Sequence, residues 1–315
     1  MRGKTRSAHC LQVLLVLGLM MTAPLLQAAD RLVVYTVNYP LQYFAQRIAG
    51  DYAEVVFPAP ADVDPAFWQP DAATIAAYQQ ADLVLLNGAG YAKWVGRVSL
   101  PRSRLVHTAA GVAADYIETT GTVTHSHGRE GSHSHAGTAF TTWLDFRQAA
   151  VQANAIREAI SRLRPQYADV FAANANALES DLLALDTRMQ AIVSAAPDTP
   201  LLASHPVYQY LARRYDLNLE AVMWEPHTLP DAGQWLAFER LLKDHPAGWM
   251  LWEGDPLQES IDRLQQHGVQ SIVFDPCGNA PGEGDFLEIM STNLRRLDRV
   301  FRSNDSGGVF QQGIE

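Results

Sequence analysis

The stretch QYADVFAANANALESDLLALDTRMQAIVSAA, residues 166–196, decides the architecture of this chain. Its apolar residues recur at helical spacing, and neither glycine nor proline interrupts it. A helix of about 30 residues is roughly 45 Å long, which is enough to cross a whole domain. The stretch therefore predicts one long backbone helix, and Pro165 separates it from a shorter helix that follows Asp145.

On both sides of residues 145–196, short β-branched runs alternate with amphipathic helical stretches. This alternation is typical of α/β architecture with mainly parallel sheets. The predicted strands are 32–37, 53–57, 83–86 and 104–107 in the first half, and 201–203, 219–223, 249–252 and 270–274 in the second. We therefore expect two α/β lobes, residues 30–144 and 197–315, joined by the connecting helices of residues 145–196.

Each predicted strand of the second lobe is followed within two residues by a potential metal ligand. These residues are His205, Glu225, Glu253 and Asp275. The crevice of an open α/β sheet lies outside the carboxyl ends of its strands, so we expect the four side chains to meet at one edge. Each alone could equally be a helix cap or a turn residue. Their joint placement favours His205 and Asp275 as metal ligands.

A second candidate site is the stretch HSHGREGSHSHAG, residues 125–137. Its histidines are His125, His127, His133 and His135. Neutral imidazole is a good ligand for zinc, copper and nickel, and a glycine-rich segment without apolar residues cannot form a packed core. A purification tag would lie at a terminus, so we interpret residues 125–135 as a metal-contacting loop rather than a tag or a merely solvated segment.

Residues 1–29 have the features of a signal peptide. Arg2, Lys4 and Arg6 precede an apolar run over 11–26, and small residues that suit cleavage follow it. We therefore expect export to the periplasm, the alternative being a retained membrane anchor. Removal of this segment moves the net charge from −10 to −13, which argues against nucleic acid as a partner. Cys277 is then the sole cysteine, which leaves no intramolecular disulfide.

Several segments together resemble the zinc/manganese class of solute-binding proteins that serve bacterial ABC importers. They are residues 33–50, 64–94, 143–145, 204–208 and 273–278. The resemblance covers essentially the whole exported chain. It implies two lobes joined by one backbone helix, a metal held between them, and a membrane permease as the partner of a monomer. A histidine-rich loop in this position is also common among the zinc-specific members of the class.

The chain departs from the family pattern at two of its four usual ligands. Ala66 stands where the family usually has the first ligand histidine, and Thr141 stands in place of the second. His205 and Asp275 match the third and fourth, but a tight zinc site needs about four protein ligands, or three and a water. The histidine-rich loop of residues 125–135, called the tract below, could supply the rest, since the six residues from His135 to Thr141 span up to roughly 20 Å.

Three functions remain open at this stage. The first is capture of a divalent transition metal, zinc or else manganese or another such ion, for delivery to an importer. The second is a periplasmic metallochaperone or zinc sensor that uses the tract while the cleft holds no metal. A metal-dependent hydrolase is the remote third, because no evident general base accompanies a complete ligand set; we expect no enzyme. Whether Glu225, Glu253, His227 or Cys277 completes the site is also open.

Overall fold

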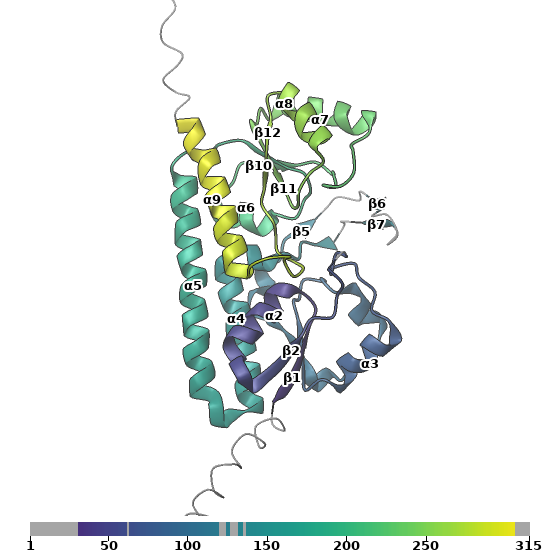
Figure 1. The fold of residues 1–315 in the computed structure, drawn as a ribbon, viewed down its shortest axis with the longest axis vertical. Coiled ribbons are helices and arrows are strands. Elements are labelled where there is room, and N and C mark those ends of the chain that lie inside the picture. Colours follow the sequence, from purple (N-terminus) through teal and green to yellow (C-terminus); the bar gives the residue numbers. More distant parts are fainter. Residues whose placement is uncertain (1–30, 62, 120–123, 127–131, 135–136, 306–315) are drawn as a thin grey trace, which may run out of the picture.

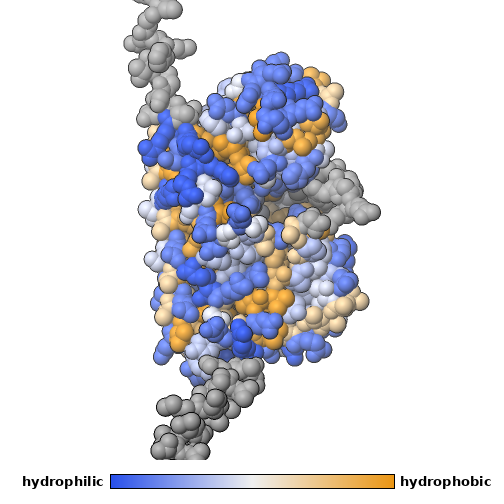
Figure 2. All heavy atoms as spheres, in the orientation of Figure 1, coloured by the Kyte–Doolittle hydropathy of each residue, from blue (hydrophilic) through white to orange (hydrophobic). Residues whose placement is uncertain are grey.

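The computed structural model describes residues 31–61, 63–119, 124–126, 132–134 and 137–305 of the 315-residue chain. The signal peptide predicted for residues 1–29 lies outside this part, as do His127 and His135 of the tract. Within the described ranges, no helix is both long and apolar enough to cross a bilayer. The face drawn in Figure 2 is mostly hydrophilic and carries separate apolar patches.

The N-terminal lobe is a four-stranded sheet in the order β2-β1-β3-β4, with every pairing parallel. Its helix α2 begins after Asn38, whose side-chain oxygen accepts a hydrogen bond from the Leu41 amide. All four residues of β3 are buried, as a central parallel strand requires. The elements are β1 (Leu32–Thr36), α2 (Tyr39–Ala49), β2 (Ala53–Val56), α3 (Ala72–Gln80), β3 (Leu83–Leu86) and β4 (Leu105–His107).

The C-terminal lobe repeats this design, with the parallel strand order β10-β9-β11-β12. Its helix α7 begins with a capping box in which Asp231 and Gln234 each bond the other's backbone amide. The elements are β9 (Leu201–Ala203), α6 (Gln209–Tyr215), β10 (Leu219–Ala221), α7 (Ala232–Asp244), β11 (Trp249–Trp252), α8 (Gln258–Gln266) and β12 (Gln270–Val273).

Three helices join the lobes: α4 (Phe146–Leu163), α5 (Ala168–Ser194) and α9 (Phe286–Asp305). In Figure 1, α5 runs beside both lobes, and α9 lies along its upper half. Helix α5 has 27 residues, somewhat fewer than predicted, because a 3₁₀ turn at Pro165–Tyr167 precedes it and the helix ends at Ser194. The predicted fold class, two parallel α/β lobes joined by one long helix, is confirmed.

Two short antiparallel ladders were not predicted. Strand β5 (Glu118–Thr119) pairs with β8 (Gly137–Thr138), and β6 (Thr124–Ser126) pairs with β7 (Ser132–Ser134). The second ladder places His125 directly opposite His133 in a segment predicted to be a loop. Serine, threonine and histidine give no apolar alternation, so backbone pairing leaves no pattern in such a sequence. Figure 1 draws β6 and β7 beside the junction of the lobes.

The remaining regular structure is a set of 3₁₀ turns. They are Gly50–Tyr52, Lys93–Arg97, Arg102–Arg104, Thr108–Asp115, Thr142–Leu144 and Pro165–Tyr167. The turn at Thr142–Leu144 matters most for function, because it holds the segment that faces the second lobe. Hydrogen bonds fix this turn and the segment before it: the Thr142 hydroxyl bonds the buried Gln152 side chain, and the Asn87 side chain donates to the carbonyl of Phe140 at 2.8 Å.

Candidate metal site

A cavity of about 380 Å³ lies between the two lobes. Four carboxylates and two imidazoles line it, together with apolar and backbone groups. These side chains are Asp64, Glu225, Glu253, Asp275, His205 and His227. Among the described residues that line the cavity there is no lysine or arginine. An electronegative chamber of this kind concentrates cations.

The carboxyl ends of the C-terminal strands supply most of these groups, as the sequence predicts. The strand order β10-β9-β11-β12 sets their order across the cavity. Backbone bonds continue each pairing past the strand end: the Trp224 amide donates to the Ser204 carbonyl at 2.7 Å, and the Ser204 amide donates to Leu251 at 2.8 Å. The resulting sequence of side chains is Glu225, His205, Glu253 and Asp275.

His205 therefore lies between two glutamates. Its Nε2 is 3.5 Å from Glu225 Oε1, and its Nδ1 is 3.8 Å from Glu253 Oε1. The imidazole is 4% exposed, whereas each glutamate side chain is 24% exposed. Burial, reinforced by the nearby charge of Glu225, raises the pKa of Glu253 well above its usual range. A bound cation would offset this repulsion among carboxylates.

Asp275 is held at the edge of the cavity by the backbone and by α9. Asn293 accepts a hydrogen bond from the Asp275 amide at 3.1 Å and donates to the Asp275 carbonyl at 2.7 Å. Its carboxylate accepts the Cys277 amide at 2.7 Å, although burial still raises the pKa of Asp275. Burial also raises the pKa of the Cys277 thiol, which is 1% exposed. The thiol thus fits a packed side chain better than a metal ligand.

The two positions where the chain departs from the family's ligand pattern have different surroundings. Ala66 is 1% exposed and is not among the described residues that line the cavity. Thr141 does line it, but its hydroxyl donates to the Val207 carbonyl of the opposite lobe at 2.5 Å. The carboxylate that the N-terminal lobe brings to the cavity is Asp64, which the sequence interpretation overlooked. Its proximity to the family's first ligand position is the signal that could have found it.

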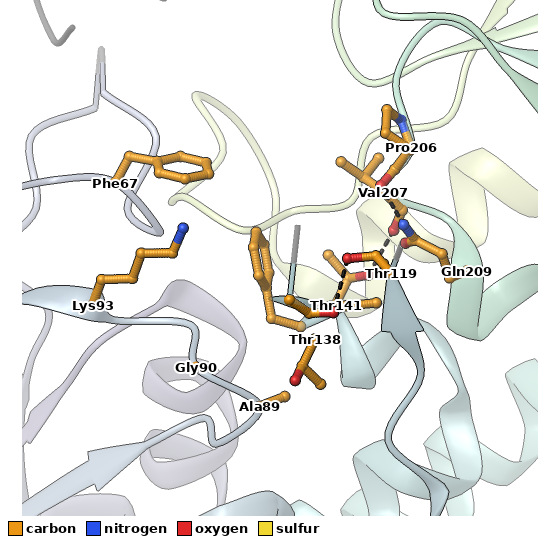
Figure 3. A pocket seen from close by; sticks show the side chains of 13 residues that line it. Phe67, Ala89, Gly90, Lys93, Thr119, Thr138, Thr141, Pro206, Val207 and Gln209 are labelled. Atoms are coloured by element: carbon orange, nitrogen blue, oxygen red, sulfur yellow. Dashed lines mark hydrogen bonds between the residues drawn. The ribbon is translucent and has the colours of Figure 1, made fainter. Parts of the chain in front are cut away.

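A second cavity, of about 280 Å³, shares a wall with the first (Figure 3). The shared residues are Phe140, Thr141 and Val207. Thr119 and Thr138, from the β5–β8 ladder at the base of the histidine tract, also line this second cavity. Figure 3 shows Lys93 directed toward Phe67, and the Lys93 ammonium lies 5.0 Å from the centre of that ring. The base of the tract thus lies one wall away from His205.

The acidic cavity is not a preassembled metal cage. Within the described residues, no three histidine, cysteine, aspartate or glutamate side chains come close enough to hold one ion together. His205 and Asp275 share the cavity without a third ligand in place. A tight site at this position requires movement of these side chains, or additional ligands from outside the described residues.

Two α/β lobes bridged by a long helix around an acidic cavity define a two-lobed solute-binding protein of the metal-binding type. The family of the periplasmic zinc-uptake complex component A, ZnuA, matches residues 34–300. The chain belongs to this family.

Relatives over most of the chain are named for zinc. The zinc-binding lipoprotein AdcA of Streptococcus pneumoniae is 25% identical over 292 residues, which are 87% of this chain and 56% of AdcA. The high-affinity zinc uptake system protein ZnuA of Bacillus subtilis is 26% identical over 287 residues, covering 85% of this chain and 87% of that protein. The chain therefore spans little more than half the length of AdcA.

Solved structures share the fold. The metal-dependent lipoprotein YcdH from Bacillus subtilis matches with a TM-score of 0.73 and 22% identity, over 86% of this chain and 99% of that one. Zn(II)-bound AdcA from Streptococcus pneumoniae matches with a TM-score of 0.71 and 21% identity, over 86% of this chain and 58% of that one. FpvC from Pseudomonas aeruginosa in complex with Mn²⁺ matches with a TM-score of 0.69 and 24% identity, over 87% of this chain and 99% of that one. At these identities the likeness establishes the fold.

Proposed function

We propose that this protein captures a divalent transition metal, zinc, in the periplasm and delivers it to the permease of a metal ABC importer. The observation that carries the proposal is the cavity between the lobes, where four carboxylates and two imidazoles converge and no lysine or arginine is present among the described lining residues. Relatives named for zinc binding and zinc uptake support this choice of metal.

The proposed shell combines His205 and Asp275 with histidines of the tract, His125, His127, His133 and His135. Two reasons favour a shared shell. The two cavity residues are too few for a tight zinc site, and the base of the tract lines the neighbouring cavity, one wall away. The tract then supplies the imidazoles that Ala66 and Thr141 no longer provide.

Zinc titration of the exported chain, residues 30–315, against a chromophoric chelator tests this proposal. Three variants are compared with the wild type: His205→Ala, deletion of residues 125–135, and a variant that keeps these residues but has the four tract histidines changed to serine. A shared shell requires that each variant lose the tightest site. The serine variant keeps the length of the segment, so it separates the effect of losing the histidine ligands from the effect of shortening the loop. Tight zinc binding that survives in any one of the three variants would exclude the shared shell.

Delivery to an importer is tested in cells. A strain lacking the protein should accumulate less zinc when a chelator limits the metal, and the wild type should restore uptake while His205→Ala should not. The alternative, a metallochaperone or sensor that uses the tract alone, gains support from the loss of two family ligands at Ala66 and Thr141. It predicts that His205→Ala leaves zinc affinity unchanged. A carrier also requires no turnover, so the zinc-loaded protein should not hydrolyse a generic ester.

A further inference from the structure

We propose that Glu225 is a metal ligand, which forms with His205 an imidazole–carboxylate pair that replaces part of the shell lost at Ala66 and Thr141. The proposal rests on the proposed function, since it names a ligand of the same cavity. Neither the histidine tract nor the resemblance to the family identifies Glu225 in this role.

The distance between the two donor atoms matches that between two ligands of one zinc ion. Zinc binds imidazole nitrogen and carboxylate oxygen at about 2.0–2.2 Å, so two such ligands at a tetrahedral angle lie about 3.4 Å apart. His205 Nε2 and Glu225 Oε1 are 3.5 Å apart. Hydrogen bonds between nitrogen and oxygen are usually 2.7–3.2 Å long. The spacing of this pair therefore matches two ligands of one ion and is longer than a usual hydrogen bond.

Backbone hydrogen bonds hold the pair in place. Glu225 follows Trp224, whose amide donates to the Ser204 carbonyl at 2.7 Å, and Ser204 directly precedes His205. The two donors therefore extend from neighbouring backbone positions that are already paired. The His205 imidazole is 4% exposed, which limits its freedom to turn away. A pair with this support can receive an ion with little loss of side-chain entropy.

Asp275 and Glu253 have different partners from Glu225. Asp275 already accepts a hydrogen bond from the Cys277 amide, and it also lines a second hollow together with Arg296. Glu253 Oε1 is 3.8 Å from His205 Nδ1, on the other side of the ring. A ligating histidine usually directs its second nitrogen toward such a carboxylate. Glu225 as ligand and Glu253 as positioning residue would give each of these two glutamates a role beside the imidazole.

The test uses Co²⁺ and Zn²⁺ on the exported chain with its tract intact. Glu225→Gln should weaken zinc at least tenfold and change the visible d–d bands of bound Co²⁺, because an oxygen ligand is lost. Glu225→His should restore tight binding with bands shifted by the new nitrogen ligand, which a merely structural role would not produce. Glu220→Gln makes the same charge change at an exposed position of β10 and should alter neither readout.

A crystal structure of the zinc-loaded wild type keeps the test independent of variant folding. The anomalous signal of zinc should place the ion about 2.0–2.2 Å from Glu225 Oε1. An ion bound in the cavity but beyond 3 Å from this oxygen, or a Glu225→Gln variant with wild-type affinity and Co²⁺ bands, would overturn the role of Glu225 and leave the proposed function intact. A wild type that takes up no zinc would instead overturn the proposed function.

Discussion

The hydroxyl of Thr141 donates a 2.5 Å hydrogen bond to the carbonyl of Val207, and this contact joins the two lobes beside the acidic cavity. Neighbouring residues make similar connections. Trp143 Nε1 donates to the Pro276 carbonyl at 2.7 Å, and the Tyr210 hydroxyl donates to the Ala139 carbonyl at 2.9 Å. The segment that resembles a ligand-bearing loop therefore serves here as an interface between the lobes.

Thr141→Val should weaken this interface while keeping the side-chain shape. It removes one hydrogen bond and leaves the Val207 carbonyl without that donor, so we expect a loss of about 1–2 kcal/mol in the free energy of unfolding. Urea denaturation of the apoprotein measures it. Thr187→Val is the matched control, because the Thr187 hydroxyl bonds only its own helix at an exposed position and should matter by less than about 0.5 kcal/mol. Equal effects of the two variants would contradict an interface role for Thr141.

Asp186 predicts how stability depends on pH. This carboxylate of α5 is 2% exposed and accepts hydrogen bonds from Arg214 at 2.7 and 2.9 Å and from the Tyr215 hydroxyl at 3.0 Å. Burial acts to raise the pKa of Asp186, but these bonds outweigh it and hold the pKa below the ordinary value of 3.8. A lowered folded-state pKa contributes stability that is fully present above the unfolded value and is lost as pH falls through the folded value.

Asp186→Asn should therefore destabilise the protein by about 3 kcal/mol at pH 7, since it removes the nearest anion from Arg214, whose side chain is 20% exposed, and leaves Asp145 at 3.8 Å. The difference from wild type should shrink once the pH drops below about 3.8. Urea denaturation at pH 7, 5 and 3 measures both. Asp181→Asn is the control, because the Arg47–Asp181 pair is 35% and 45% exposed and should contribute less than about 1 kcal/mol. If the difference in free energy of unfolding between the two proteins stays constant down to pH 3, ionisation of Asp186 does not cause it.

The sequence was sufficient for the fold because periodicity and strand-end residues are local signals. Alternating short strands and helices predicted both parallel sheets, and the end of each C-terminal strand predicted where His205 and Asp275 meet. The flanking of His205 by Glu225 and Glu253 could not be predicted, because it depends on the order β10-β9-β11-β12, which no local pattern encodes. The burial of Ala66, which is not among the described lining residues, likewise depends on packing of the whole lobe.

Glu253→Gln should lower zinc affinity by about tenfold without changing the set of ligands. The carboxylate faces His205 Nδ1, and such a partner fixes the orientation of a ligating imidazole and raises its basicity. Competition with a chelator gives the affinity, and the d–d bands of bound Co²⁺ should keep their positions. Glu239→Gln is the control, because it removes a carboxylate 3.7 Å from His267 Nε2, in a pair outside the cavity lining. Shifted Co²⁺ bands would instead make Glu253 a ligand.

Restoring the two family histidines should raise zinc affinity only slightly. Ala66 is 1% exposed and is not among the described lining residues, so an imidazole at this position must displace packed neighbours before it can reach the cavity. Thr141→His also removes the hydrogen bond to Val207. We therefore expect Ala66→His with Thr141→His to raise zinc affinity by less than tenfold, or about 1.4 kcal/mol. Zinc titration of the double variant, with Thr141→His alone as control, measures this. A larger gain would mean that the cavity still accommodates the family's ligand set and that the two substitutions only removed it.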